Sequence, residues 1–372
     1  MYYVGLMSGT SVDSVDAAVI ALPPDGSLLK AAVHYAIPAA LRAEIQALCR
    51  AGEKPPSGEL EGAMGVDTEL GRLFAEAALA VIEQSGISKS SIRAIGSHGQ
   101  TVRHRPDGRR PFSIQLANPS VIAEATGITT VADFRARDIA VGGQGAPLAS
   151  AFHNAMFRSS SRNRAVVNIG GIANVTFLPA DTRTSVLGFD TGPGNTLLDQ
   201  WIRSARGLDY DDEGHWADGG TANAELLKHL LGDPYFKKAP PKSTGRELFN
   251  LEWLQVRLNK LGGALNPQTV QATLLQLTAT TIAQAIAGLS PKVDEAYVCG
   301  GGTHNSALVA ALAKALGKIP LRTTRDLGLD PDWVEAATFA WLAHQTLEGQ
   351  PGNLPSVTGA KRPVVLGGIY RA

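Results

Sequence analysis

Residues 8–16 combine side chains that could do chemistry with a backbone suited to binding phosphate. Hydroxyls, a glycine and two carboxylates stand between two apolar runs, in the order Ser8-Gly9-Thr10-Ser11-Val12-Asp13-Ser14-Val15-Asp16. Small residues let a backbone approach a phosphate closely, and hydroxyl and amide groups donate hydrogen bonds to its oxygens. Asp13 and Asp16 could hold a metal ion beside it, directly or through water. The stretch therefore indicates a phosphate-binding hairpin, with an ordinary glycine-containing turn as the alternative interpretation.

Two further glycine-rich turns stand at the ends of apolar runs. The run 165–169 turns at Gly170-Gly171 into a second apolar run, and the run 296–299 is followed by Gly300-Gly301-Gly302 and a helical pattern. The turn at residues 8–16 is not a familiar nucleotide-binding loop, because it lacks the lysine of a P-loop and the glycine spacing of a dinucleotide-binding loop. At the third turn, N–H groups and the positive end of the following helix could meet a nucleotide. Each turn alone is a weak signal, but the three together predict nucleotide binding.

The elements that must position these turns follow from hydrophobic periodicity. After the first hairpin, strands are expected at 92–96, 113–116, 129–132, 165–169, 172–177, 186–189 and 296–299. Helices are expected at 41–49, 66–86 and 119–126, from 197, from 267, after residue 305 and at 333–347. This alternation favours an α/β fold with largely parallel sheets. The strand–turn–strand device appears in both halves, so we expect two similar domains.

Residues 207–250 are rich in charge, glycine and proline and form a long excursion from this pattern. An excursion of this length in an α/β chain is either functional or a surface elaboration. The sequence leaves both interpretations open.

Composition excludes several classes of protein. The 372 residues suffice for two domains, and Lys+Arg and Asp+Glu are equal at 34 each, so no net charge attracts nucleic acid or an anionic membrane. The two cysteines, Cys49 and Cys299, are far apart and have no metal-ligand spacing. Neither a basic leader with an apolar core nor a run long enough to span a bilayer is apparent. We therefore expect a cytoplasmic protein without nucleic-acid or membrane partners.

Four motifs taken together resemble the anhydro-N-acetylmuramic acid kinases, a family of the sugar kinase/Hsp70/actin superfamily. They are Met7-Ser8-Gly9-Thr10-Ser11, Ser97-His98-Gly99-Gln100-Thr101, Asn168-Ile169-Gly170-Gly171-Ile172-Ala173-Asn174 and Gly188-Phe189-Asp190-Thr191-Gly192-Pro193-Gly194-Asn195. The similarity extends over residues 133–138, 141–148 and 300–305 and so covers nearly the whole chain. The first motif of the family usually has glycine where this chain has Ser14.

The resemblance implies a two-lobed actin-like ATPase fold, built from ribonuclease H-like domains around a central cleft for nucleotide and sugar. We expect an N-terminal lobe over 1–145 and a C-terminal lobe over 146–372, with the last helix a candidate to return to the first lobe. It also implies a cytoplasmic homodimer that uses ATP, Mg²⁺ and water to convert 1,6-anhydro-N-acetylmuramic acid into N-acetylmuramic acid 6-phosphate during peptidoglycan recycling.

The three glycine-rich turns provide the expected nucleotide contacts, and ATP is the nucleotide that the resemblance implies. Expected ATP-binding residues are Gly9, Thr10, Ser11, Val12, Asp13, Ser14, Val15, Asp16, Asn168, Gly170, Gly171, Gly300, Gly301 and Gly302. Mg²⁺ would bridge phosphate oxygens, and Asp13 and Asp190 are its expected anchors, through water.

Asp190 is the candidate catalytic residue. Opening the 1,6-anhydro bridge frees O6 to attack the γ-phosphate, while water adds at C1. A carboxylate can take the proton from that water, and the family's catalytic aspartate falls on Asp190. The alternative is an aspartate that only initiates the turn it precedes.

Sugar recognition needs a partner for the lactyl carboxylate and for the polar groups of the ring. A guanidinium fork from Arg135 or Arg137 could bind the carboxylate bidentately, and one of the two is expected rather than both. The alternative is an ion pair with Asp133 or Asp138. The other expected sugar-binding residues are Ser97, His98, Gln100, Thr101, Asp190 and Glu335. For His98 the alternative is a structural hydrogen bond, and for Glu335 a favourable interaction with its helix dipole.

Other functions compete with this interpretation. An ordinary N-acetylhexosamine 6-kinase would use the aspartate to deprotonate a free sugar hydroxyl. An Hsp70-like or actin-like ATP switch would instead need a peptide-binding domain or polymerisation surfaces. A catalytically inactive sugar-binding relative is a further alternative, against which the presence of Asp190 argues.

Overall fold

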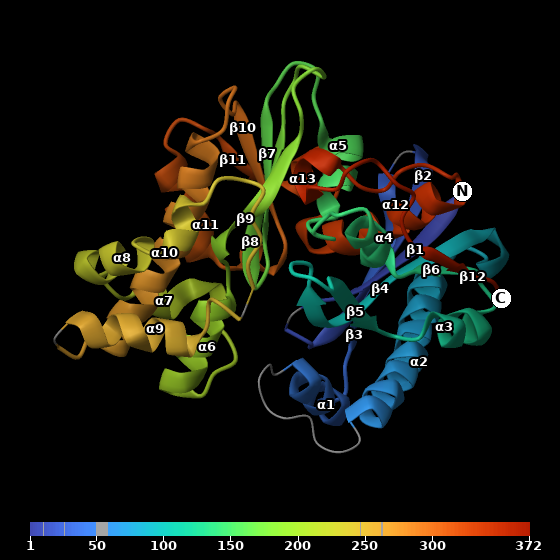
Figure 1. Cartoon of the computed structure of the whole chain (residues 1–372), viewed down its shortest axis with the longest axis horizontal. Helices are drawn as coiled ribbons and strands as arrows, with labels where there is room; N and C mark the ends of the chain where they lie inside the picture. Colours follow the sequence, from blue (N-terminus) through green and yellow to red (C-terminus); the bar gives the residue numbers. More distant parts are fainter. Residues whose placement is uncertain (10, 26, 50–58, 246, 262) are drawn as a thin grey trace. The chain divides into compact units, whose positions relative to one another are not determined.

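The computed structural model describes residues 1–9, 11–25, 27–49, 59–245, 247–261 and 263–372, and the chain divides into two compact units (Figure 1). Unit 1 comprises Met1–Phe152 and Trp333–Ala372, and unit 2 comprises His153–Asp332. The C-terminal segment therefore belongs to the unit that contains the N-terminus.

Unit 1 is built on one mixed sheet of seven strands in its described residues. These strands are β1 (Tyr2–Ser8), β2 (Ser14–Asp25), β3 (Ser27–Ala36), β4 (Ile92–Arg105), β5 (Phe112–Leu116), β6 (Thr130–Ala132) and β12 (Gly368–Tyr370). The helices of this unit are α1 (Ala39–Cys49), α2 (Glu59–Ser85), η1 (Lys89–Ser91), α3 (Pro119–Thr126), α4 (Phe134–Ala140), α12 (Val334–Leu347) and α13 (Pro355–Thr358). Helix α5 (Ala149–Phe157) contains the boundary at residue 152.

Unit 2 is built on a five-stranded sheet in its described residues. The strands are β7 (Arg164–Ile169), β8 (Ile172–Leu178), β9 (Leu187–Pro193), β10 (Glu295–Cys299) and β11 (Leu321–Thr323). The α-helices are α6 (Thr196–Arg206), α7 (His215–Asp218), α8 (Ala224–Leu231), α9 (Leu251–Leu258), α10 (Pro267–Ala287) and α11 (Ser306–Leu316). The 3-10 helices are η2 (Asp212–Gly214), η3 (Pro234–Lys237), η4 (Asn259–Leu261), η5 (Gly301–His304), η6 (Thr324–Leu327) and η7 (Pro331–Trp333), the last of which ends at the first residue of the returning segment.

Both sheets repeat one topology. The order is β6-β4-β1-β2-β3 in unit 1 and β11-β10-β7-β8-β9 in unit 2. In each unit three consecutive antiparallel strands come first, and two parallel strands then extend the sheet beyond the first strand. The expected α/β fold with two ribonuclease H-like lobes is confirmed. The expectation of largely parallel sheets is wrong, because the opening hairpins supply three antiparallel strands to each sheet.

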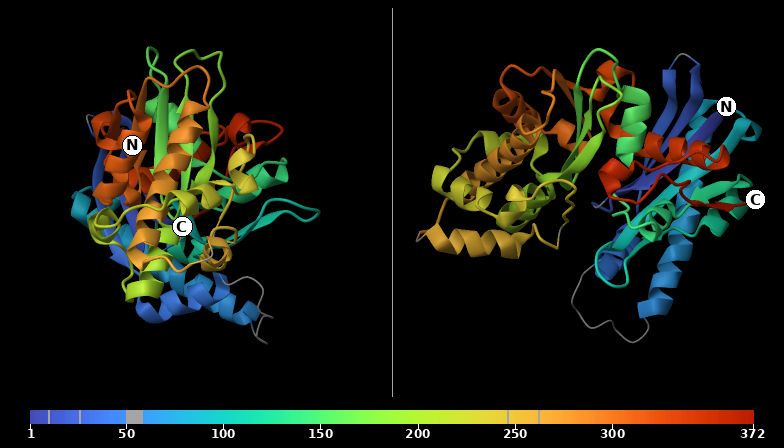
Figure 2. Two further views of the ribbon diagram at one scale, coloured as in Figure 1. Left: turned by 90° about the vertical axis from the view of Figure 1, so that its left-hand side faces the viewer. Right: turned by 45° about the horizontal axis from the view of Figure 1, so that its top comes forward.

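Two parts of the structure lie outside the elements expected from the sequence. Strand β3 is only half-buried along most of its length, so its residues show no clear apolar alternation. The excursion 207–250 contains the helices η2, α7, α8 and η3, and its residues Leu226, Leu230 and Tyr235 are buried in the core of unit 2. Figure 2 shows its helices α7 and α8 beside α10 of the same unit.

Helix α12 lies directly against strands β1 and β4 in unit 1 (Figure 1). A Cβ atom on Gly5 would overlap the carbonyl oxygen of Ala336, and one on Gly96 would overlap that of Phe339. Because Gly5 and Gly96 have no Cβ atom, the backbone of α12 can pack directly against β1 and β4. In this way a segment more than 300 residues further along the chain is fixed beside the first hairpin.

Gly96→Ala should be strongly destabilising, because the new methyl group meets backbone rather than a movable side chain. We expect a loss of about 3 kcal/mol in the free energy of unfolding, at the upper end of overpacking effects. Gly65→Ala is the matched control, because Gly65 lies in α2 with open space around its Cβ position. It should gain about 1 kcal/mol from helix propensity. Denaturant unfolding of both variants checks the pair, and equal stabilities would contradict the packing described.

Candidate active site

The first glycine-rich turn of unit 1 connects β1 to β2, with Met7 opposite Asp16. Asp13 holds the turn, since one of its carboxylate oxygens accepts the Ser11 hydroxyl at 2.6 Å and the Ser14 N–H at 3.0 Å. Val12 has a φ of 58°, an uncommon and strained conformation for a β-branched residue. Backbone strain in this turn therefore falls on Val12 and not on Ser14, which is paired with Ala36 as the first residue of β2.

The expected ATP-binding residues of this turn differ in what they can offer a ligand. Thr10 lies outside the described residues. The side chains of Val12 and Val15 are buried in the core of unit 1, so only their main-chain groups could face a phosphate. Asp13 is exposed, whereas Asp16 is half-buried and lies 2.7 Å from Nδ1 of His34.

Strand β4 brings the second motif next to this hairpin. Ser97 is opposite Leu6 and Gln100 is opposite Ser8, with a register shift between them where Gly99 adopts a φ of 73°. The expectation that residues 97–101 follow the end of a strand is wrong. They lie inside β4, which continues to Arg105 by pairing with β5, and the irregularity at Gly99 reorients the strand next to Ser8.

His98 and Arg135, both expected to bind the sugar, lie together in unit 1. The Arg135 guanidinium donates to Nε2 of His98 at 2.9 and 3.0 Å and to the Gly145 carbonyl at 2.6 Å. His98 Nδ1 lies 2.8 Å from the Gly99 carbonyl, so these partners assign its proton to Nδ1. Burial, followed by the charge of Arg135, holds the pKa of His98 well below its ordinary value. A neutral His98 therefore orients the guanidinium of Arg135.

The other residues around α4 separate into two roles. Arg137 is exposed on α4, so the expectation of one site arginine favours Arg135. Asp138 is fully buried, accepts hydrogen bonds from the Gly145 N–H, Asn353 and Thr358, and so ties the returning C-terminal segment to this loop. Thr101 accepts a hydrogen bond from Gln115.

Glu335 lies in the first turn of α12 and is half-buried. The next residue, Ala336, contacts Gly5 of β1. This placement puts Glu335 beside the sheet that carries Ser8 and Ser97.

Acid should destabilise the folded protein through its buried histidines. Burial lowers the pKa of His153 to about 3, and burial together with Arg135 lowers that of His104 to about 4. The unfolded chain binds these protons near pH 6.5, so stability is complete above that pH and falls as the pH decreases. By pH 5 the fully buried His153 should cost about 2 kcal/mol. His153→Gln should flatten the dependence of the melting temperature on pH, and His215→Gln, at an exposed position, should not.

In unit 2, three polar residues form one row across neighbouring strands. Asn168 is opposite Asn174, and Asn174 is opposite Asp190. Directly opposed residues of antiparallel strands share a face of the sheet. Their neighbours Val167, Val175 and Phe189 belong to the apolar core of unit 2, so the polar row occupies the opposite face.

The glycine turns of unit 2 meet at the end of this row. Cys299 is opposite Asn168, so the turn after β10 follows immediately beside the end of β7. Gly300 has a φ of 82°, and a Cβ atom there would overlap Oδ1 of Asn168. A Cβ atom on Gly302 would overlap the Ile169 side chain, whereas that of Gly301 would meet open space. The carbonyl oxygens of Gly170-Gly171 accept N–H groups at the start of α6.

This cradle fits a nucleotide. The exposed Gly301 gives a phosphate close access to the backbone, and Asn168 Oδ1 is buried without a hydrogen-bond partner among the described residues. The structure thus brings together Asn168, the 170–171 turn and the 300–302 turn, as expected for the residues of one binding site.

Asp190 lies inside β9 rather than in a turn after it, which corrects the expected strand end at 189. Strand β9 continues to Pro193 because Ile172 and Ala173 pair with Pro193 and Gly192. Thr191 is the extra residue of a β-bulge, and Gly192 after it has a φ of 150°. Bulges reorient side chains next to active sites, and this one follows Asp190 directly.

Three hydrogen bonds fix Asp190 on the open side of β9. The Tyr235 hydroxyl donates to its carbonyl oxygen at 2.7 Å, and its own N–H donates to the Lys242 carbonyl at 3.1 Å. The N–H of Thr244 donates to its Oδ2 at 2.9 Å. The carboxylate is half-buried, and these bonds fix the backbone and one carboxylate oxygen of Asp190 in place.

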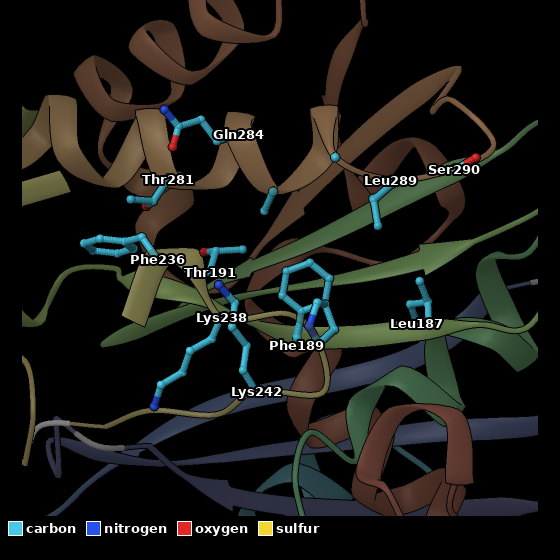
Figure 3. A pocket seen from close by; sticks show the side chains of 13 residues that line it. Leu187, Phe189, Thr191, Phe236, Lys238, Lys242, Thr281, Gln284, Leu289 and Ser290 are labelled. Carbon is cyan, nitrogen blue, oxygen red and sulfur yellow. The ribbon is translucent and has the colours of Figure 1, made fainter. Parts of the chain in front are cut away.

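A cavity of about 400 Å³ lies in unit 2 between β9, α10 and residues 236–242 (Figure 3). Leu187 and Phe189 line it from β9, on the face opposite to Asp190, and Thr281 and Gln284 line it from α10. Lys238 and Lys242 lie on the side away from α10. Burial lowers the pKa of Lys242, whose ammonium group lies 4.8 Å from the centre of the Tyr235 ring.

Asp13 of unit 1 and Asp190 of unit 2, the expected anchors of Mg²⁺, each offer a single carboxylate. Among the described residues, no group of three or more His, Cys, Asp and Glu side chains is arranged to hold a metal ion. Single carboxylates fit an ion that phosphate oxygens and water coordinate for the most part. In the described part of the chain, no helix has the length and hydropathy to cross a membrane.

Four residues near Asp190 were missed by sequence reasoning. Asn174 could have been found, because Asn168 and Asn174 each stand three residues from Gly171 and so lie opposite each other across the hairpin. Tyr235, Lys242 and Thr244 gave no such signal, because they lie more than 40 residues beyond Asp190.

Comparison with known proteins places this arrangement among relatives. Residues 1–372 match the family model described as anhydro-N-acetylmuramic acid kinase. The chain is 50% identical over 371 residues to the Coxiella burnetii (strain Dugway 5J108-111) protein of that name, covering 99% of this chain and 97% of that protein. It is 49% identical to the protein of that name from Shewanella halifaxensis, covering 100% of this chain and 99% of the relative.

Solved structures resemble the chain more distantly. The activator of the 2-hydroxyisocaproyl-CoA dehydratase from Clostridium difficile is 13% identical, with 94% of this chain and 96% of that chain covered and a TM-score of 0.47. The ROK hexokinase from Thermus thermophilus is 16% identical, with 92% and 100% covered and a TM-score of 0.37. Both TM-scores lie below 0.5, so the relationship rests on the sequence relatives.

Proposed function

This chain belongs to the anhydro-N-acetylmuramic acid kinase family, and we propose that Asp190 is its general base. The chain is an ATP-dependent kinase of peptidoglycan recycling, whose reaction turns 1,6-anhydro-N-acetylmuramic acid and water into N-acetylmuramic acid 6-phosphate. The observation that supports the role of Asp190 is its place in the row with Asn168 and Asn174, beside the glycine cradle of unit 2.

The proposed reaction couples two displacements. Asp190 takes a proton from a water molecule as the water oxygen forms a bond to C1 of the sugar. The C1–O6 bond breaks, and O6 forms a bond to the γ-phosphorus as the bond from that phosphorus to the β–γ bridging oxygen of ATP breaks. Little covalent help is needed at phosphorus, because positioning and charge neutralisation dominate phosphoryl transfer. Asp190 therefore supplies the one proton transfer that the ring opening requires.

The glycine-rich turns are proposed to hold ATP. In unit 2, the exposed Gly301 and the Asn168 carboxamide lie where β7 and β10 end. In unit 1, the 9–16 turn offers main-chain N–H groups and the Ser11 hydroxyl. Mg²⁺, when bound, would neutralise charge on the β- and γ-phosphates, with Asp13 and Asp190 as its anchors through water.

Arg135 is proposed to bind the lactyl carboxylate of the sugar. His98 fixes the plane of its guanidinium from one side, and a planar fork oriented in this way suits bidentate recognition of a carboxylate. Ser97, Gln100 and Thr101 on β4 and Glu335 on α12 are proposed to contact the remaining polar groups of the sugar. Asn174 joins the proposed site because it lies between Asn168 and Asp190.

The proposal is tested by incubating the purified protein with ATP and Mg²⁺ and either 1,6-anhydro-N-acetylmuramic acid or N-acetylglucosamine. We expect ADP and a 6-phosphosugar from the anhydro sugar. Phosphorylation of N-acetylglucosamine alone would contradict the proposal and indicate a conventional N-acetylhexosamine 6-kinase. ATP hydrolysis that neither sugar accelerates would indicate an ATP switch.

The homodimer and the cytoplasmic location are also proposed, on the resemblance to the family alone. Sedimentation at several protein concentrations tests the first, and a single monomeric species at micromolar concentration would contradict it. Cell fractionation tests the second.

A further inference from the structure

Asp190 is held at the edge of a sheet by a segment remote from it in sequence. Strand β9 ends the order β11-β10-β7-β8-β9, so in the described part of the chain one side of its backbone is not paired with another strand. On that side, the N–H and carbonyl groups of Asp190 bond to Lys242 and Tyr235, and its carboxylate bonds to the Thr244 N–H. We call residues 233–244 the edge segment.

We propose that the edge segment positions the general base and that Tyr235 is its principal positioning residue. The proposal rests on the role proposed above for Asp190. An unpaired edge leaves a strand free to move or to pair elsewhere. By bonding both main-chain groups of Asp190, the edge segment fixes the backbone from which the carboxylate projects, just before the bulge at Thr191.

Tyr235 is built to act as a fixed donor. It is 2% exposed, and burial together with the charge of Asp190 raises the pKa of its hydroxyl, so it stays protonated at every working pH. Its ring packs edge-on against Phe249, with ring centres 5.5 Å apart, and the Lys242 ammonium lies 4.8 Å from its centre. The hydroxyl therefore has little freedom except to donate to Asp190.

A buried ion pair anchors the start of the edge segment. Asp233 accepts the Tyr235 N–H at 2.8 Å and the Trp253 indole N–H at 2.9 Å, and it pairs with Arg257. The Arg257 guanidinium also lies 3.9 Å from the centre of the Trp253 ring. A chain of contacts thus runs from α9 through Asp233 and Tyr235 to Asp190.

Packing alone does not hold the edge segment in place. Its side toward α10 borders the 400 Å³ cavity, which Phe236, Lys238 and Lys242 line (Figure 3). Hydrogen bonds to Asp190 must therefore supply the precision that a filled interior would otherwise give. This argument favours a functional role for the excursion 207–250, which the sequence left open.

The test is Tyr235→Phe, which removes one oxygen and keeps the ring. We expect kcat to fall about 30-fold, because small displacements of a catalytic group cost up to about 100-fold. KM for ATP and for the anhydro sugar should change by less than about twofold, because Tyr235 is not proposed to touch either substrate. Tyr297→Phe is the matched control. Tyr297 is also 2% exposed, but it lies on β10, away from Asp190.

Asp233→Asn is a second variant, and it affects Asp190 only through Tyr235. The asparagine keeps an oxygen that can accept the Tyr235 N–H. It should lower kcat by less than Tyr235→Phe and leave both KM values unchanged. The double variant should lose less than the product of the two single losses, because both act through Asp190. Independent, multiplicative losses would contradict the chain of contacts.

The outcomes separate the two proposals. If Tyr235→Phe keeps a kcat within twofold of the wild type, or raises KM while kcat is unchanged, the positioning role is overturned. If that happens while Asp190→Asn is inactive, the general base stands and only the edge segment loses its role. If Asp190→Asn itself turns over normally, the proposed function of Asp190 fails and the positioning role fails with it.

Discussion

Asp190→Asn is expected to lower kcat by about 10³–10⁴-fold while ATP still binds. Loss of a general base costs up to about this factor, and no other acidic side chain is proposed to replace it. The amide has the shape of the carboxylate and keeps an oxygen that can accept the Thr244 N–H, so the fold around β9 should persist. A coupled assay for ADP measures kcat, and calorimetric titration measures ATP binding.

Asp218→Asn provides the control for Asp190→Asn. It makes the same chemical change at an exposed position at the end of α7 in the same unit. This variant should match the wild type in turnover and stability. Activity of Asp190→Asn close to that of the control would remove Asp190 from catalysis.

Gly300→Ala should weaken the affinity for ATP more than an alanine substitution at any other glycine of these turns. The residue has a φ of 82°, which L side chains adopt rarely, and its Cβ would overlap Oδ1 of Asn168. The new methyl group must displace either the Asn168 carboxamide or the turn itself. We expect KM for ATP to rise about 100-fold or more, together with a loss of stability of about 2 kcal/mol.

Gly301→Ala is the matched control for the second prediction, because Gly301 has open space at its Cβ position and lies in the same turn. Its melting temperature without nucleotide should equal that of the wild type. Any rise in its KM for ATP then reports how closely a phosphate approaches the backbone at Gly301. Equal effects of the two variants on stability without nucleotide would contradict the cradle described for Asn168.

The sequence could predict what local chemistry determines. Small residues between two apolar runs have few structures open to them besides a tight hairpin, so the turn after β1 and the turn at Gly170-Gly171 were found. The helix caps at Asn118 and Asn266 were also predictable from local sequence, because each asparagine is followed by proline at the first helical position. The fold class followed from these elements and from the resemblance.

Contacts between distant segments were beyond such reasoning. Asp190 takes its partners from residues 45 to 54 positions later in the chain, and their spacing shows no periodicity that could point to β9. The continuation of β4 from Gln100 to Arg105 depends on its pairing with β5, and the need for glycine at position 96 arises only when α12 returns from the other end of the chain. In each case tertiary contact, rather than local propensity, decides the structure.

The central claim is that Asp190 directs water to C1 while O6 takes the phosphate, and isotope labelling tests it most directly. The reaction is run with the anhydro sugar, ATP and Mg²⁺ in ¹⁸O-labelled water, and the 6-phosphosugar is analysed before anomeric exchange proceeds. We predict one labelled oxygen at C1, acquired at the rate of ADP formation, and unlabelled oxygen at O6. A product without label at C1, or label that appears only at the rate of anomeric exchange, would contradict the coupled ring opening.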